Sequence, residues 1–151
     1  VGAGKNARSL VEEAIRLKKE SEPRDHYWCV FDRDSFPPQT FNAALQLARN
    51  AGFEVAYSNE AFELWFLLHF SYSDTGLARH LYAEKLSKLL GRPYKKNDSK
   101  LYETLLPRQD TAIRNATKLL ASYGANHNPE KDNPSTRVHL LVQLLRDAQQ
   151  R

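Results

Sequence analysis

The stretch that decides the fold is 26-HYWCVFDRD-34, in which a run of apolar and aromatic residues ends in Asp32 and Asp34. Such a run predicts a strand covered on both faces, as in parallel sheets. Side chains alternate along a strand, so both aspartates leave it on the same side. Ligands of open α/β sheets bind at the carboxyl ends of strands, and two close carboxylates need a cation such as Mg²⁺ between them. The stretch therefore predicts a parallel strand with a metal site at its end.

Helices and a second strand surround this strand in alternating order. Residues 6–19 have helical spacing, with glutamates early and lysines late, and Pro23 follows. A second helix is expected at residues 41–48, a second strand at residues 53–57, and a third helix from Ser58-Asn59 to Phe70. This order predicts an α/β fold with a parallel sheet, whose strands are joined by right-handed crossovers and flanked by helices.

The second half of the chain shows helical patterns and no further strand. Helices are expected at residues 77–90, 101–106 and 111–123, and Ser135 or Thr136 is expected to cap a last one. We therefore divide the chain into an α/β core at residues 1–75 and a basic helical extension at residues 76–151. The extension packs on the core, so that both form a single compact domain.

Composition and charge narrow the class of protein. The chain has 151 residues, of which 41% are hydrophobic and 26% charged, as expected of a globular domain. No apolar run approaches the roughly 20 residues that span a bilayer, so no membrane partner is expected. The single cysteine, Cys29, predicts a buried small side chain and a reducing, cytoplasmic location. Residues 1–75 hold 8 basic and 11 acidic residues, against 14 and 7 in residues 76–151. This split suits a polyanionic substrate, and an ordinary solvated surface explains it equally well.

The third expected helix carries a second group of candidate site residues. It follows the second strand, so it begins at the same sheet edge as the two aspartates. Glu63 lies on a segment that is apolar nearly all round, so its carboxylate needs a metal or a basic side chain as partner. A structural ion pair is the alternative. Glu60 is explained by the helix dipole alone, and His69 by packing.

A basic loop and a polar turn complete the candidates. Tyr94, Lys95 and Lys96 can contact phosphate and stack on a base, although a solvated loop has the same composition. By themselves, Asn133-Pro134-Ser135-Thr136 indicate a turn and a helix cap.

The four motifs VFDRD (30–34), SNEAFELWFLLHF (58–70), YKK (94–96) and NPST (133–136) together resemble the RloB family over almost the whole chain. That family is similar to Toprim proteins and is associated with bacterial anti-phage and abortive-infection loci, often next to an ATPase. The resemblance implies a Toprim-like, metal-dependent nuclease core in which Asp32 and Asp34 match the Toprim D-x-D motif. It also places Asn59, Glu63, Lys96 and the turn from Asn133 to Thr136 in a shared site.

One part of the family pattern is missing. Toprim-like members carry a glutamate after their first strand, in an E-G-x-x-T-E stretch that this sequence lacks. We therefore expect the first strand to be absent, and this chain alone to have little or no nuclease activity.

These observations lead to one favoured function and two alternatives. The favoured function is an endonuclease dependent on Mg²⁺ or Mn²⁺ that acts on DNA or RNA. Asp32, Asp34 and Glu63 would hold the metal, Lys96 would serve catalysis, and Asn59, Lys95, Lys96, Asn133, Ser135 and Thr136 would bind nucleic acid. The alternatives are a phosphatase of the haloacid dehalogenase type, with Asp32 as nucleophile and Asp34 as acid, and a non-catalytic nucleic-acid-binding or adaptor module. The oligomeric state stays open.

Overall fold

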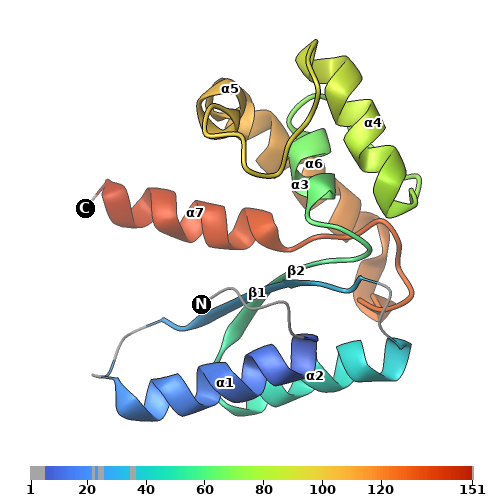
Figure 1. Cartoon of the computed structure of the whole chain (residues 1–151). Helices are drawn as coiled ribbons and strands as arrows, with labels where there is room; N and C mark the ends of the chain where they lie inside the picture. The colour runs from blue at the N-terminus through green and yellow to red at the C-terminus, as the bar shows by residue number, and fades with distance from the viewer. Residues whose placement is uncertain (1–5, 22, 24–25, 35–36, 151) are drawn as a thin grey trace.

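The computed structural model describes residues 6–21, 23, 26–34 and 37–150. Figure 1 shows the arrangement of the elements. In chain order they are α1 (Ala7–Glu20), β1 (Trp28–Asp32), α2 (Pro38–Asn50), β2 (Glu54–Ser58), α3 (Glu63–Leu68), α4 (Arg79–Leu90), α5 (Leu101–Leu105), the 3₁₀ turn η1 (Leu106–Arg108), α6 (Gln109–Ser122), the 3₁₀ turn η2 (Gly124–Asn126) and α7 (Val138–Gln149).

The two strands form the parallel sheet that the sequence predicts, with Asp32 opposite Ser58 in register. Helices α1 and α2 lie side by side and cover one face of this sheet (Figure 1). Asn6 begins α1 as expected, because its side chain accepts a hydrogen bond from the Ser9 N–H at 2.9 Å. The alternating order of helices and strands is therefore confirmed.

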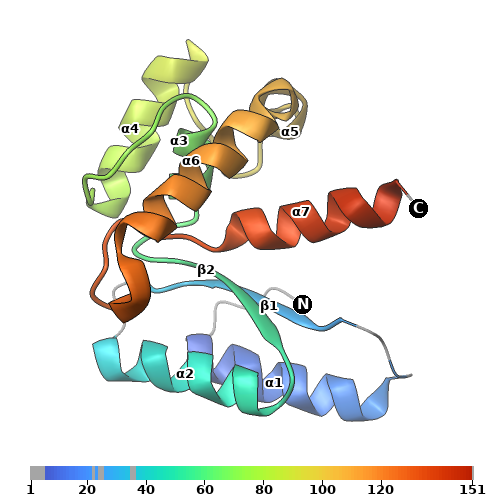
Figure 2. The ribbon, with the colours of Figure 1, turned by 180° about the vertical axis from the view of Figure 1, so that it is seen from behind.

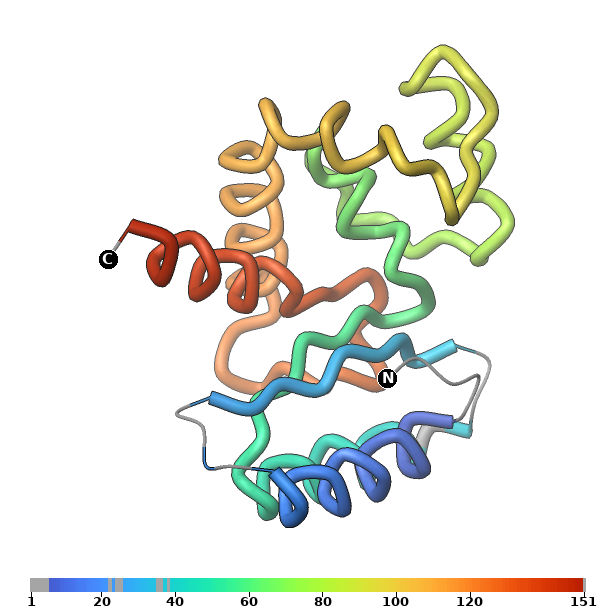
Figure 3. Tube along the Cα trace, turned by 60° about the vertical axis from the view of Figure 1, so that its left-hand side comes forward, coloured from blue at the N-terminus to red at the C-terminus, as the bar shows by residue number. Residues whose placement is uncertain are grey.

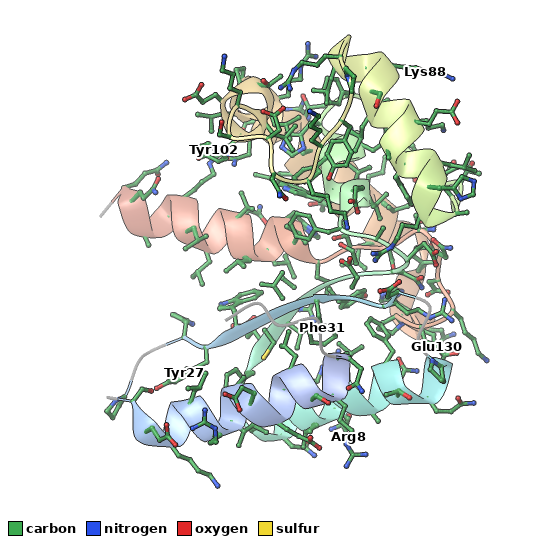
Figure 4. All side chains as sticks on the ribbon, viewed as in Figure 1. Arg8, Tyr27, Phe31, Lys88, Tyr102 and Glu130 are labelled. Atoms are coloured by element: carbon green, nitrogen blue, oxygen red, sulfur yellow. The ribbon has the colours of Figure 1, made fainter. Side chains whose placement is uncertain are left out.

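The core below the sheet consists of apolar side chains from α1, α2 and the two strands. Phe31 points from β1 into this layer (Figure 4) and packs edge-to-face on Phe41, which in turn packs on Tyr57. Cys29 is a free, buried residue in the same layer, and burial raises its pKa to about 11. The expectation of a buried cysteine is confirmed.

The opposite face of the sheet is covered less completely. Helix α7 lies over this face and packs on β2 (Figures 1 and 2). Val30 on β1 stays 41% exposed. The prediction that the first strand is covered on both faces is therefore wrong for Val30, because α7 packs chiefly on the other strand.

A second core joins α3 to the C-terminal helices. Leu64, Leu68 and Tyr82 are fully buried among side chains of α3, α4 and α6. Helix α3 lies in the first half of the sequence, yet it packs on α4 and α6 of the second half. His69 follows α3, donates from Nδ1 to the Trp65 carbonyl at 2.9 Å and is 3% exposed, which confirms a packing histidine.

A short extended segment before α7 was not predicted. Ser58 and Thr136 form an antiparallel bridge, the Asn59 N–H donates to the Ser135 carbonyl at 2.8 Å, and the Arg137 N–H donates to the Tyr57 carbonyl at 2.8 Å. Figure 3 shows the chain returning to the sheet at this point, directly before α7. Residues 135–137 thus extend the sheet beyond β2, and a segment this short has no periodicity that a sequence could reveal.

The third helix begins later than predicted. Ser58 still belongs to β2, Glu60 adopts a left-handed backbone with φ 69°, and α3 starts only at Glu63. The prediction that this helix begins at Ser58-Asn59 is wrong, because the side chains of both residues bond to the segment 129–136 instead of capping a helix. Thr136 does accept the Val138 N–H at 3.3 Å, although α7 itself begins at Val138.

The remaining helices follow their sequence signals closely. Gly91 ends α4 in the left-handed region, with φ 67°. Pro107 ends α5 as expected, and the 3₁₀ turn that contains it leads directly into α6. Within the described ranges, none of these helices has the length and apolar character needed to cross a membrane.

Candidate functional site

The candidate site lies where β1 and β2 end. Asp32 and Ser58, paired in register, are the last residues of the two strands. Directly beyond them, Asp34 and Glu60 both have left-handed backbones, with φ 52° and 69°. Aspartate tolerates this region, whereas the longer glutamate adopts it rarely, and such outliers concentrate at functional sites.

Asp32 is a partly buried carboxylate with both positively and negatively charged side chains nearby. Burial raises its pKa to about 6, the Arg79 guanidinium and the Phe62 N–H lower it, and the Glu63 carboxylate raises it. The cost of desolvation therefore exceeds the gain from its 3.0 Å ion pair with Arg79. Groups with pKa values displaced by burial and neighbouring charge are typical of active sites.

Arg79 links the two strand ends. It is the first residue of α4, and its Nη2 lies 3.0 Å from Asp32 Oδ2 and 3.5 Å from Asp34 Oδ1. The same nitrogen donates to the Glu60 carbonyl at 3.3 Å. One guanidinium thus lies near both aspartates of the D-x-D motif, although Asp34 follows the end of β1 and has a left-handed backbone rather than belonging to the strand.

Glu63 is buried, as its apolar helix predicts, and is 4% exposed. Its Oε1 accepts a hydrogen bond from the Tyr94 hydroxyl at 3.2 Å and lies 3.5 Å from Lys96 Nζ. Its Oε2 is buried and has no hydrogen-bond partner among the described residues. A buried carboxylate oxygen without a donor is an open ligand position.

Tyr94 and Lys96 bring the basic loop to the carboxylates. The Tyr94 ring packs on Phe66, and burial together with Glu63 raises the pKa of its hydroxyl, which keeps it protonated as a donor. The Lys96 side chain is 63% exposed, so its ammonium group can reach both Glu63 and an incoming anion. The predicted proximity of Lys96 to Glu63 is therefore present in the structure.

Other predicted site residues lie apart from this cluster. Asn59, Ser135 and Thr136 are at most 1% exposed. The Asn59 amide donates to the carbonyls of Pro129, Glu130 and Asp132 at 2.8–3.2 Å. We therefore assign these three residues to holding the segment 128–136 against β2 rather than to contact with nucleic acid. Asn133 and Lys95 are exposed.

A second polar cluster fixes the same segment. The Tyr57 hydroxyl bonds to His127 Nε2, and His127 Nδ1 lies 2.6 Å from Asp132 Oδ2. A carboxylate only accepts, so Nδ1 carries the proton and Tyr57 donates to Nε2. Glu130, labelled in Figure 4 near α2, accepts from Asn42 of that helix at 3.1 Å. Tyr57 is fully buried, so this chain of bonds anchors the segment.

Sequence reasoning missed one residue of the site, Arg79, and gave another, Tyr94, a different role. Arg79 carried a usable signal, because a cation in the first turn of a helix opposes the dipole and so points to a carboxylate partner. Tyr94 was noted as a base-stacking residue, whereas the structure uses its hydroxyl to hold Glu63.

Asp32 and Glu63 are the two carboxylates of the cluster that could hold a divalent cation. Asp32 lies close enough to Glu63 for their charges to interact, and Glu63 offers a free buried oxygen. Mg²⁺ typically binds through one or two carboxylates and takes its other ligands from water and substrate phosphates. No group of three or more histidine, cysteine, aspartate or glutamate side chains that could hold a metal ion occurs in the described part of the chain. Asp34 Oδ1 lies 3.5 Å from the same Arg79 nitrogen that binds Asp32.

Fold and site together define a small α/β protein in which carboxylates and basic side chains gather beside the ends of two parallel strands. The chain belongs to the RloB-like protein family, whose model matches residues 1–145. No curated protein and no solved structure matches the chain.

Proposed function

We propose that the chain is a Toprim-like nuclease subunit that uses Mg²⁺ or Mn²⁺ to cleave nucleic acid, in bacterial anti-phage defence. One observation carries the proposal. Asp32, the last residue of β1, and Glu63, the first residue of α3, interact through their charges in a partly buried cluster. Burial raises the pKa of Asp32 to about 6, and Glu63 Oε2 has no hydrogen-bond partner among the described residues. Family membership supports the same function.

Different side chains of the cluster would have different roles in cleavage. Asp32 and Glu63 would hold the cation, and Tyr94 orients Glu63 through its hydrogen bond. The bound cation would polarise the phosphate and lower the pKa of a water molecule. Lys96 is exposed enough to turn from Glu63 toward a phosphate oxygen, where it offsets the negative charge that develops during hydrolysis.

The direct test is a cleavage assay of the intact gene product on single-stranded DNA, double-stranded DNA and RNA, with added Mg²⁺ or Mn²⁺. Glu63→Gln should abolish cleavage because it removes a ligand charge while preserving the side-chain shape. Glu84→Gln, at an exposed position of α4, is the matched control and should retain full activity. Equal cleavage by the Glu63→Gln variant and the wild type would refute the proposal.

One observation favours a non-catalytic binding module as second candidate. Arg79 neutralises both aspartates, which would suit a site that binds without reacting. Such a module would bind nucleic acid equally well with and without a divalent cation and would cleave none. A haloacid-dehalogenase-type phosphatase would instead form an aspartyl phosphate at Asp32, which phosphoenzyme trapping detects.

Replacing Lys95 and Lys96 together by alanine should weaken nucleic-acid binding and flatten its dependence on salt. Each phosphate contact contributes about one unit to the slope of log affinity against log salt, so the double variant should lose up to about two units. Fluorescence anisotropy with a labelled oligonucleotide at several salt concentrations measures the slope. The double variant Lys85→Ala/Lys88→Ala removes two exposed lysines of α4 and should change the slope less. A slope unchanged in the Lys95/Lys96 variant would exclude both residues from the contact surface.

A further inference from the structure

Arg79 uses only part of its guanidinium in the candidate site. Among the described residues, its contacts with Asp32, Asp34 and the Glu60 carbonyl all use the single nitrogen Nη2. Its Nε is buried and lacks a hydrogen-bond partner among the described residues. A guanidinium has five N–H donors in a planar fork that matches a carboxylate or a phosphate through two parallel bonds. The observed arrangement therefore leaves much of its binding capacity unused.

The charges around Arg79 show what could displace it. Asp32, Asp34 and Glu63 supply three formal negative charges, while Arg79 and Lys96 supply two positive ones. A divalent cation bound between Asp32 and Glu63 would weaken the hold of Asp32 on Arg79 and repel its guanidinium. Arg79 is the first residue of α4, so its side chain can swing while the helix stays in place.

We propose that Arg79 holds Asp32 in the resting protein and becomes a phosphate anchor once a divalent cation, bound between Asp32 and Glu63, displaces it from that carboxylate. The inference rests on the proposed function and names the residue that couples metal binding to substrate binding. The freed fork, Nε included, would bind two oxygens of the phosphodiester, while the backbone at Asp34 and Glu60 keeps both strand ends in place. Arg79 thus opposes metal binding and favours binding of the nucleic acid.

This dual role predicts opposite changes in one variant. Arg79→Gln should bind Mn²⁺ about tenfold more tightly, because the competing charge is gone. It should also bind an oligonucleotide about tenfold more weakly in the presence of Mn²⁺, because the phosphate contact is lost. Isothermal titration calorimetry measures the first change, and anisotropy the second. Arg114→Gln, at an exposed position of α6, removes the same charge and should leave both affinities unchanged.

Two further variants make the test decisive. Arg79→Lys keeps the charge without the fork, so it should bind Mn²⁺ like the wild type and the oligonucleotide more weakly. Combining Arg79→Gln with Asp32→Asn should remove the gain in Mn²⁺ affinity. Unchanged, weaker or undetectable Mn²⁺ binding in Arg79→Gln would overturn the inference. Tighter Mn²⁺ binding in Arg79→Gln would support the role of Arg79 even if the intact gene product cleaves no nucleic acid. That absence of cleavage would refute the nuclease proposal separately.

Discussion

Replacing Asp32 by asparagine is expected to stabilise the fold by about 2 kcal/mol at pH 8 while abolishing divalent-cation binding. Burial raises the pKa of Asp32 from 3.8 to about 6. A shift of this size means that the folded protein pays about 3 kcal/mol of free energy to keep Asp32 ionised at pH 8. This net shift already includes the favourable charge of Arg79, and partial exposure of the Asp32 carboxylate lowers the expected gain to about 2 kcal/mol. Urea unfolding and Mn²⁺ titration measure the two effects.

The stability gained by Asp32→Asn should depend on pH in a definite direction. Because the pKa of Asp32 is higher in the folded protein, its stabilising contribution is complete below the unfolded pKa and is lost as pH rises through about 6. The advantage of Asp32→Asn should therefore disappear near pH 4. The control Asp147→Asn, at an exposed position of α7, should show no such trend. An Asp32→Asn variant less stable than the wild type at pH 8 would show that the ion pair outweighs the cost of burial.

The second large effect is expected at Asn59. Replacing it by alanine should destabilise the protein by about 2–4 kcal/mol, because three carbonyls of the segment 128–136 lose their donor. Asn59→Asp should cost more at neutral pH, since it places a negative charge against those carbonyls. Urea unfolding at pH 7 measures both free energies.

Two additional measurements separate this structural role from direct contact with nucleic acid. Hydrogen exchange in Asn59→Ala should accelerate first in residues 128–136, because they lose their anchor to β2. Asn97→Ala, in an exposed loop, should leave stability unchanged. If Asn59→Ala keeps wild-type stability but loses affinity for nucleic acid, Asn59 contacts the ligand and our assignment is wrong.

The sequence predicted the parallel strands and the meeting of their ends, because both depend on local patterns. The apolar run before Asp32 and the alternation of helix and strand fix the sheet edge, and the apolar surroundings of Glu63 predict its burial. The hydrogen-bond partners of the Asn59 side chain could not be predicted, since they lie about 70 residues away and only tertiary packing brings them to β2. The same holds for Arg79, whose partner Asp32 is 47 residues away.

The exposure of Val30 has a related cause. A run of apolar residues indicates that a strand is suited to burial, but it does not indicate which helix will cover that strand. Helix α7 packs on β2, so Val30 on β1 stays partly exposed although its neighbours Cys29 and Phe31 are buried.

The most direct test of the central claim is to locate the bound cation by paramagnetic broadening of amide NMR signals. Substoichiometric Mn²⁺ is added to ¹⁵N-labelled protein, and the broadened amides mark the site. We predict selective broadening at residues 32–34, 60–63 and 94–96, and its loss in Asp32→Asn. Broadening centred instead on the exposed glutamates Glu12 and Glu20 of α1, or unchanged in Asp32→Asn, would contradict the claim that Asp32 and Glu63 form the metal site.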